Sequence, residues 1–269
     1  GPRRNYVQLE ISADISDPSL FTRPQQARIT RQYLGISQYF ESNQKAMRET
    51  LSTEYLKRLK VIRASEVSAK HKVDATNTWA TALFRYYLAS MRWYWQNLSV
   101  VDAETWKVIR NHKYIYGVSA CERLYLPRAE GGRGLLKIRY VWEREVLSST
   151  LYLARTAEAD PHLQAVWQHQ LYRNSLMLYT NLGETKRIAE DYDLGGVLEA
   201  RDETKNVVAR LSEKQLQKLR ESVQGKKGHG IYWNMISKPE IDTDKCHLWL
   251  KDGRLHAKTE SYIIALQDG

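Results

Sequence analysis

The chain has 269 residues, of which 42% are hydrophobic, and a formal net charge of +10 at pH 7. This length and composition allow one large or two modest domains with a buried core, and the basic balance favours a polyanionic partner, nucleic acid before an anionic membrane surface. The sequence has no apolar run of about 18 residues and no signal-peptide pattern, so we expect no membrane-spanning helix and no membrane partner.

The first 40 residues predict strands rather than helices. Residues 6–11 alternate apolar and polar side chains, and QYLGIS at 32–37 is a second short strand candidate. The two could pair as a β ribbon ahead of a mainly α protein.

Helical periodicity begins near Asn43. One apolar stripe predicts a helix that ends before Ser65, and a second predicts a helix capped by Ser65 that runs to about Trp95, roughly 45 Å long. Ser99 and Asp102 have the spacing of a capping box, which predicts a helix from there to about Tyr116.

The rest of the chain also predicts helices, separated by turns. We expect helices over 136–157 and from Asp160-Pro161, two helices capped by Asp202 and Ser212, a loop at 224–230, and short helices over 242–250 and 257–266.

The stretch RLYLPRAEGGRGLL, residues 123–136, places arginines among glycines. It lacks the order of a nucleotide-binding loop. Because glycine lets a partner approach the backbone closely, Arg128 and Arg133 are candidates for contacting a nucleic-acid backbone. A structural turn with solvated arginines is the alternative.

Residues 45–72 contain eight Lys or Arg against three Glu. This pattern is typical of a solvated helix face or of a surface that tracks phosphates. The candidates for phosphate contact are Lys57, Lys60, Arg63, Lys70 and Lys72. Aromatic residues in RYYLASMRWYW, 85–95, could stack on bases or fill the core.

The sequence offers no catalytic constellation and no metal site. Cys121 and Cys246 are the only cysteines, without zinc-ligand spacing, which favours an intracellular protein. The acidic stretch EDYDLGG does not match a calcium-binding loop. We expect no catalytic residue, no bound metal and no cofactor in this chain.

Four stretches together resemble one family. QYLGIS (32–37), ATNTWATALFRYYLASMRW (75–93), RLYLPRAEGGRGLL (123–136) and WLKDGRLHAKTESYIIALQDG (249–269) occur in that order. They resemble the region downstream of the polymerase active site in non-LTR (LINE-type) retrotransposon reverse transcriptases, chiefly those with a C-terminal restriction-like endonuclease. Residues 160–235 match only in their helical, charged character.

The resemblance implies an organisation and a function. Residues 1–37 would be the trailing edge of the palm, 40–120 a helical thumb and 121–269 a helical connector, in which the glycine-arginine loop contacts nucleic acid or fixes the thumb to the connector. The family's F/YxDD catalytic turn, zinc knuckle and nuclease core have no counterpart here, and the Mg²⁺ of the parent RNA-directed DNA polymerase would bind outside this chain. Whether the chain belongs to an enzyme stays open, and we expect both ends to be cuts through a longer polypeptide.

Three functions therefore remain. The first is a thumb and connector segment that holds RNA and RNA–DNA or DNA duplex, alongside the palm, zinc knuckle and endonuclease of the same polyprotein, in the nucleus. The second is a domesticated, non-catalytic remnant that binds nucleic acid or protein. The third is a helical interaction scaffold whose charge serves only solubility.

Overall fold

The computed structural model describes residues 31–33, 36–38, 44–198 and 203–268, which fall into two units divided between residues 42 and 43. In the first unit, strand β1 (Arg31–Tyr33) pairs antiparallel with strand β2 (Ile36–Gln38), with Gln32 opposite Ser37. The stretch predicted as one strand therefore contains two strands that pair with each other. Its predicted partner, residues 6–11, lies outside the described residues.

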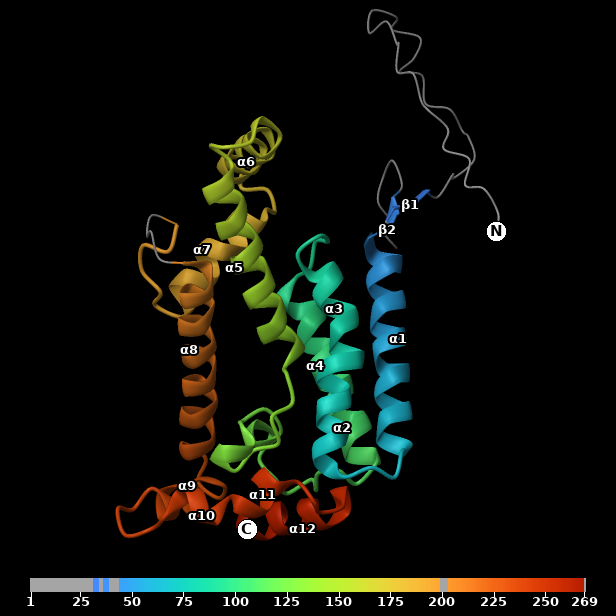
Figure 1. The fold of residues 1–269 in the computed structure, drawn as a ribbon, viewed down its shortest axis with the longest axis vertical. Helices are drawn as coiled ribbons and strands as arrows, with labels where there is room; N and C mark the ends of the chain where they lie inside the picture. The colour runs from blue at the N-terminus through green and yellow to red at the C-terminus, as the bar shows by residue number, and fades with distance from the viewer. Residues whose placement is uncertain (1–30, 34–35, 39–43, 199–202, 269) are drawn as a thin grey trace, which may run out of the picture. The chain divides into compact units, whose positions relative to one another are not determined.

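The second unit is helical, which confirms the mainly α prediction (Figure 1). Its first part contains α1 (Gln44–Ala64), α2 (Ala69–Ala75), the π-helical turn η2 (Thr76–Ala80), α3 (Thr81–Leu88) and α4 (Trp95–Asn111). The chain α2–η2–α3 packs between α1 and α5 (Ile138–Thr156), and α4 packs on both α1 and α5.

The long helix predicted from Ser65 to Trp95 is wrong at both ends. Ser68, not Ser65, caps α2 by accepting a hydrogen bond from the backbone of His71. The helix ends at Leu88, because α1 supplies hydrogen-bond partners for the turn that follows. The backbone N–H of Arg92 donates to Gln44 Oε1, and the Arg48 guanidinium donates to the backbone carbonyl of Arg92. The chain then reverses into α4.

The second part of this unit follows two short 3-10 turns, η3 (Cys121–Leu124) and η4 (Arg128–Glu130). After α5, it contains α6 (Pro161–Ser175), α7 (Asn181–Asp191), α8 (Thr204–Gln224), α9 (Gly230–Ile236), α10 (Thr243–Cys246), α11 (Leu248–Asp252) and α12 (Ala257–Asp268). None of the helices in the described ranges is both long and apolar enough to cross a membrane.

Several predicted boundaries in this part are confirmed and others are wrong. Asp160 caps α6 and Pro161 occupies its first turn, as predicted. The two helices expected around Ser212 are one, α8, in which the Ser212 hydroxyl donates to the Val208 carbonyl instead of capping a new helix. Helix α9 was not predicted.

Buried apolar side chains form two clusters. The first contains side chains of α1, α3, α4, α5, α7 and α8, including Tyr55, Phe84 and Trp142. The second includes Ile109, Leu124 and Trp233, and joins the end of α4 to the glycine-arginine loop, α8 and α9. Both clusters contain residues from before and after residue 120. The boundary predicted there between thumb and connector stays a prediction.

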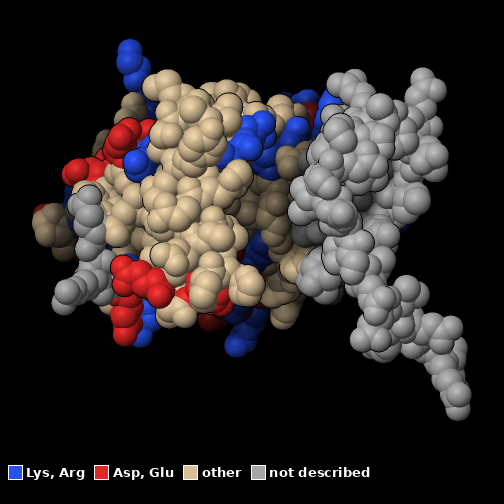
Figure 2. Space-filling model, turned by 90° about the horizontal axis from the view of Figure 1, so that it is seen from above, with Lys and Arg blue, Asp and Glu red and all other residues tan. Residues whose placement is uncertain are grey.

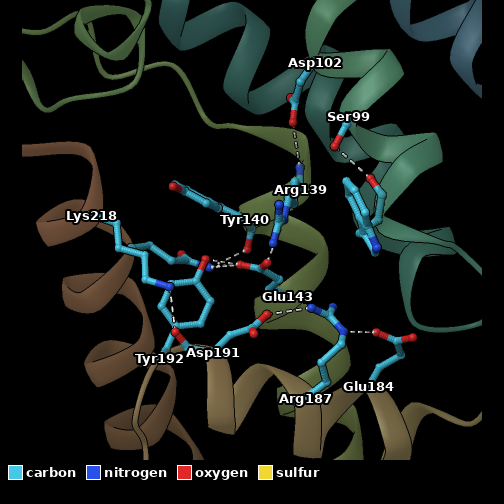
Figure 3. Close-up of polar contacts among 12 residues, drawn as sticks. Ser99, Asp102, Arg139, Tyr140, Glu143, Glu184, Arg187, Asp191, Tyr192 and Lys218 are labelled. Carbon is cyan, nitrogen blue, oxygen red and sulfur yellow. Dashed lines mark hydrogen bonds and ion pairs between the residues drawn. The ribbon is translucent and has the colours of Figure 1, made fainter. Parts of the chain in front are cut away.

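A buried polar network joins the helices that surround the first cluster. Glu143 of α5 is fully buried and accepts hydrogen bonds from Arg139 (3.0 Å), Tyr192 (2.8 Å) and Gln215 (2.8 Å), which connect α5 to the end of α7 and to α8 (Figure 3). Buried polar groups require partners of this kind. The network therefore fixes how these three helices meet.

Asp102 has a different role from the one predicted. It lies inside α4, and its carboxylate accepts hydrogen bonds from the backbone N–H groups of Ile138 (2.9 Å) and Arg139 (3.3 Å) at the start of α5 (Figure 3). Ser99 also lies inside α4 and donates to the carbonyl of Trp95. The predicted capping box is therefore wrong, and Asp102 caps a helix that is distant in sequence.

Candidate nucleic-acid interface

The arginines of the glycine-arginine loop are directed into the protein. Arg123 is fully buried, and its guanidinium binds Asp268 Oδ1 at 2.8 Å and donates to the Gly131 carbonyl at 3.0 Å. Since Asp268 is the last residue of α12, this ion pair joins the loop to the C-terminal helix.

Arg128 and Arg133 bind the same acid. Glu260 of α12 is fully buried; Arg128 pairs with its Oε1, and Arg133 Nη1 lies 3.4 Å from its Oε2. Arg128 also donates to the Leu250 carbonyl at 2.6 Å. The guanidinium of Arg133 is fully buried, so it cannot reach a phosphate. The predicted contact of Arg128 and Arg133 with a nucleic-acid backbone is therefore corrected: both arginines form internal ion pairs with Glu260.

The glycines of this loop serve internal packing. Gly131 and Gly134 have φ angles of 75° and 74°, which disfavour residues with a side chain. A Cβ at Gly132 would overlap the Leu126 carbonyl oxygen, and one at Gly131 would contact the His247 ring. The close approach that these glycines permit is therefore made by the chain itself. The alternative of a turn with solvated arginines is also wrong, because Arg123 and Arg133 are fully buried and Arg128 pairs with Glu260.

Two further predicted residues, Arg63 and Lys72, are also buried. Arg63 donates to the Lys72 carbonyl (3.2 Å) and to Thr76 Oγ1 (2.7 Å), and burial lowers the pKa of its guanidinium. Lys72 Nζ in turn donates to the Arg63 carbonyl at 2.9 Å. The prediction that these two cations contact phosphate is corrected, because they join α1 to α2.

Three of the predicted cations keep solvent contact. Lys57 and Lys60 are exposed on α1, where Lys57 is loosely paired with Glu54 at 4.0 Å. Lys70 is half-buried and donates to the Lys251 carbonyl at 3.5 Å. Of the seven predicted cations, Lys57 and Lys60 are therefore the two with exposed side chains.

Tertiary contacts join segments of the chain that carry other exposed cations. Tyr114, which follows α4, donates to the Ala69 carbonyl at 2.7 Å, and the Ala69 backbone donates to Leu255 at 3.3 Å. The rings of Tyr116 and Tyr262 lie 4.7 Å apart. These contacts join the start of α2 to the segment after α4 and to the region of α12, and the hydrogen bonds between Arg63 and Lys72 join α2 to the end of α1.

We call the exposed cations on these joined segments the basic end. They are Lys60, Arg110, Lys113, Arg254 and Lys258. In segments 60–72, 110–116 and 251–258 the exposed acids are Glu66 and Asp252, and no ion pair joins any of the five cations to an acid among the described residues. Unpaired exposed cations can neutralise phosphates without first breaking an internal ion pair.

Sequence reasoning missed four of these five residues. Arg110, Lys113, Arg254 and Lys258 form no basic run and lie about 140 residues apart in two groups. Only the tertiary contacts of Tyr114 and Ala69 join them, so no local pattern could have identified them.

The described residues contain no group of three or more His, Cys, Asp or Glu side chains placed to hold a metal ion. Comparison of the chain with protein-family models, with curated proteins and with solved structures finds no match.

Proposed function

We propose that this chain is a thumb and connector segment of a non-LTR-type reverse transcriptase, and that its basic end holds template–primer duplex by phosphate contacts. The proposal draws on the sequence resemblance described above and on the five unpaired cations of the basic end. Such cations bind a duplex with little regard to sequence, which suits a polymerase that must move along its template.

The observation that favours this function most is that some cations are buried in ion pairs that hold the fold, while others are exposed to solvent. Arg123, Arg128 and Arg133 hold α12 against the glycine-arginine loop through buried ion pairs. Arg254, three residues before α12, and Lys258, in its first turn, remain exposed. The motif thus positions the helix that presents the binding cations, and these cations are the residues expected to contact phosphate.

The remaining steps of reverse transcription would belong to other parts of the polyprotein. The palm would hold Mg²⁺ and the catalytic carboxylates, and a zinc knuckle and an endonuclease would follow the connector. No chemical step is assigned to residues of this chain.

A specific observation favours a protein-binding remnant as the second candidate. Helix α6 has Arg173 as its single Lys, Arg, Asp or Glu and has no buried residue, and it exposes Val166, Tyr172 and the adjoining Leu176. The space-filling view shows a broad expanse without charged side chains on one face (Figure 2). Exposed apolar surface of this kind is typical of a contact with another protein.

Charge reversal separates these functions. We expect the double variant Lys60→Glu, Lys113→Glu to bind an RNA–DNA duplex at least tenfold more weakly than the unmodified chain at about 50 mM salt, by fluorescence anisotropy. The matched control is Lys186→Glu with Lys205→Glu, two exposed lysines of α7 and α8. Equal affinity of the two double variants, or no binding by the unmodified chain, would favour the scaffold or the protein-binding remnant.

A further inference from the structure

An aromatic surface lies on the side of α3, apart from the cations of the basic end. Trp79 is 47% exposed and Tyr86 is 49% exposed, although large aromatic side chains are usually covered. Trp93, in the same aromatic-rich stretch, is buried against Phe84 at 5.6 Å. Trp93 therefore belongs to the core, whereas Tyr86 and the preceding Trp79 are exposed.

The π-helical turn η2 places Trp79 at the surface. Thr76 and Thr78 donate to carbonyls four residues earlier, those of Lys72 and Asp74, while Thr76 also accepts from buried Arg63. Single π-helical turns within helices are rare and occur frequently at functional sites. Here the turn is held from inside the protein and carries an exposed indole.

Tyr86 lies seven residues after Trp79, which is close to two helical turns, so the two residues lie on one side of the helix with an axial rise of about 10 Å between them. The exposed residue between them on that side is Ala82, whose side chain is small. The two rings therefore border an open strip of helix surface.

Neighbouring side chains steady both rings. The Arg58 guanidinium of α1 lies 5.1 Å from the centre of the Trp79 ring and donates to the Trp79 carbonyl at 3.1 Å. Tyr87 meets the Tyr86 ring edge-on at 4.9 Å. A ring that is already held loses less conformational entropy when a ligand stacks on it.

The charges around the rings are mixed. Arg58 pairs with Glu54 at 3.1 Å, and exposed Arg85 lies 4.0 Å from Glu145 of α5. Cations that already have acid neighbours attract phosphate less than the free cations of the basic end. Binding at this surface must therefore depend on the rings, which select bases whose faces are open.

We propose that Trp79 and Tyr86 form a stacking site for unpaired bases of single-stranded nucleic acid. The site rests on the proposed function, because the strand would continue from a duplex at the basic end.

Oligonucleotides with and without bases test this site. The probes are RNA and DNA of about 16 nucleotides, an abasic backbone of the same length and an RNA–DNA duplex. The double variant Trp79→Leu, Tyr86→Leu is compared with Tyr152→Leu, a matched change of a 60% exposed ring on α5. Thermal denaturation verifies that both variants fold as the unmodified chain does.

We expect the double variant to lose roughly tenfold or more in affinity for base-bearing single strands, with the abasic strand and the duplex unaffected. The tighter of RNA and DNA identifies which strand the site receives. Unchanged affinity for base-bearing strands, or an equal loss for the abasic strand, would overturn the stacking site. If duplex binding persists in that case, the proposed function stands; if the unmodified chain binds no duplex, the proposed function has failed as well.

Discussion

Tyr114 is contacted by two buried arginines. The guanidinium carbons of Arg63 and Arg133 lie 4.3 Å and 4.0 Å from the centre of its ring, and its hydroxyl donates to the Ala69 carbonyl. The attraction between a cation and the face of an aromatic ring is strongest when both groups are removed from water. These residues therefore serve the interior, and a basic side chain in a motif need not face a polyanion.

Glu260 supplies the negative charge for Arg128 and Arg133. Removing one member of a buried ion pair leaves an uncompensated charge, so we expect Glu260→Gln to lower the free energy of unfolding by about 3 kcal/mol. Urea denaturation measures this, with Glu66→Gln, an exposed acid after α1, as the control. A loss below about 1 kcal/mol, the range of surface pairs, would contradict the buried pairing.

Asp102 gives a pH-dependent expectation. Burial raises the pKa of its carboxyl from 3.8 to about 6, against the opposing effect of the two backbone N–H donors of α5. The folded state therefore holds a proton that the unfolded state has released between about pH 4 and pH 6, so this group lowers stability as pH rises through that window. The shift corresponds to about 3 kcal/mol.

Asp102→Asn removes this titration. We expect the free energy of unfolding of the unmodified chain to fall relative to that of Asp102→Asn as pH rises from about 4 to about 7, by up to about 3 kcal/mol. The exposed Asp74→Asn should follow the unmodified chain. Parallel curves for the unmodified chain and Asp102→Asn would show that the carboxyl is not desolvated.

At the scale of elements, the sequence predicted the existence of most helices but not where the chain reverses. An apolar stripe was sufficient for α1, and Asp160-Pro161 was sufficient for the start of α6. The end of α3 depends on Gln44 and Arg48, which satisfy the backbone of Arg92 from another helix. Long-range hydrogen bonds of this kind leave no local signal, which also explains the misplaced capping box.

Gly132 tests the packing of the glycine-arginine loop. A methyl group there would overlap the Leu126 carbonyl, and backbone cannot move aside as a flexible side chain can. We expect Gly132→Ala to cost about 1–3 kcal/mol of stability in thermal denaturation. Gly228→Ala, where a Cβ meets nothing within 4 Å, is the control. Equal melting temperatures for the two variants would contradict the tight fit.

At the scale of the whole molecule, the formal charge of +10 predicted a polyanionic partner without locating it. Of the seven cations chosen from sequence, Arg63, Lys72 and Arg133 are buried and Arg128 is paired with Glu260. Lys70 is half-buried, and Lys57 and Lys60 are exposed. Burial is set by tertiary packing, so composition could give the total charge but not the surface that presents it. The basic end combines segments from three parts of the chain.

Salt dependence of duplex binding tests this account most directly. Each phosphate contact adds about one to the slope of log affinity against log salt. We predict that replacing the five cations of the basic end by Ala reduces the slope for an RNA–DNA duplex by about 3 to 5, while Lys186→Ala with Lys205→Ala leaves it nearly unchanged. A slope that is the same in all three proteins would contradict phosphate binding at the basic end.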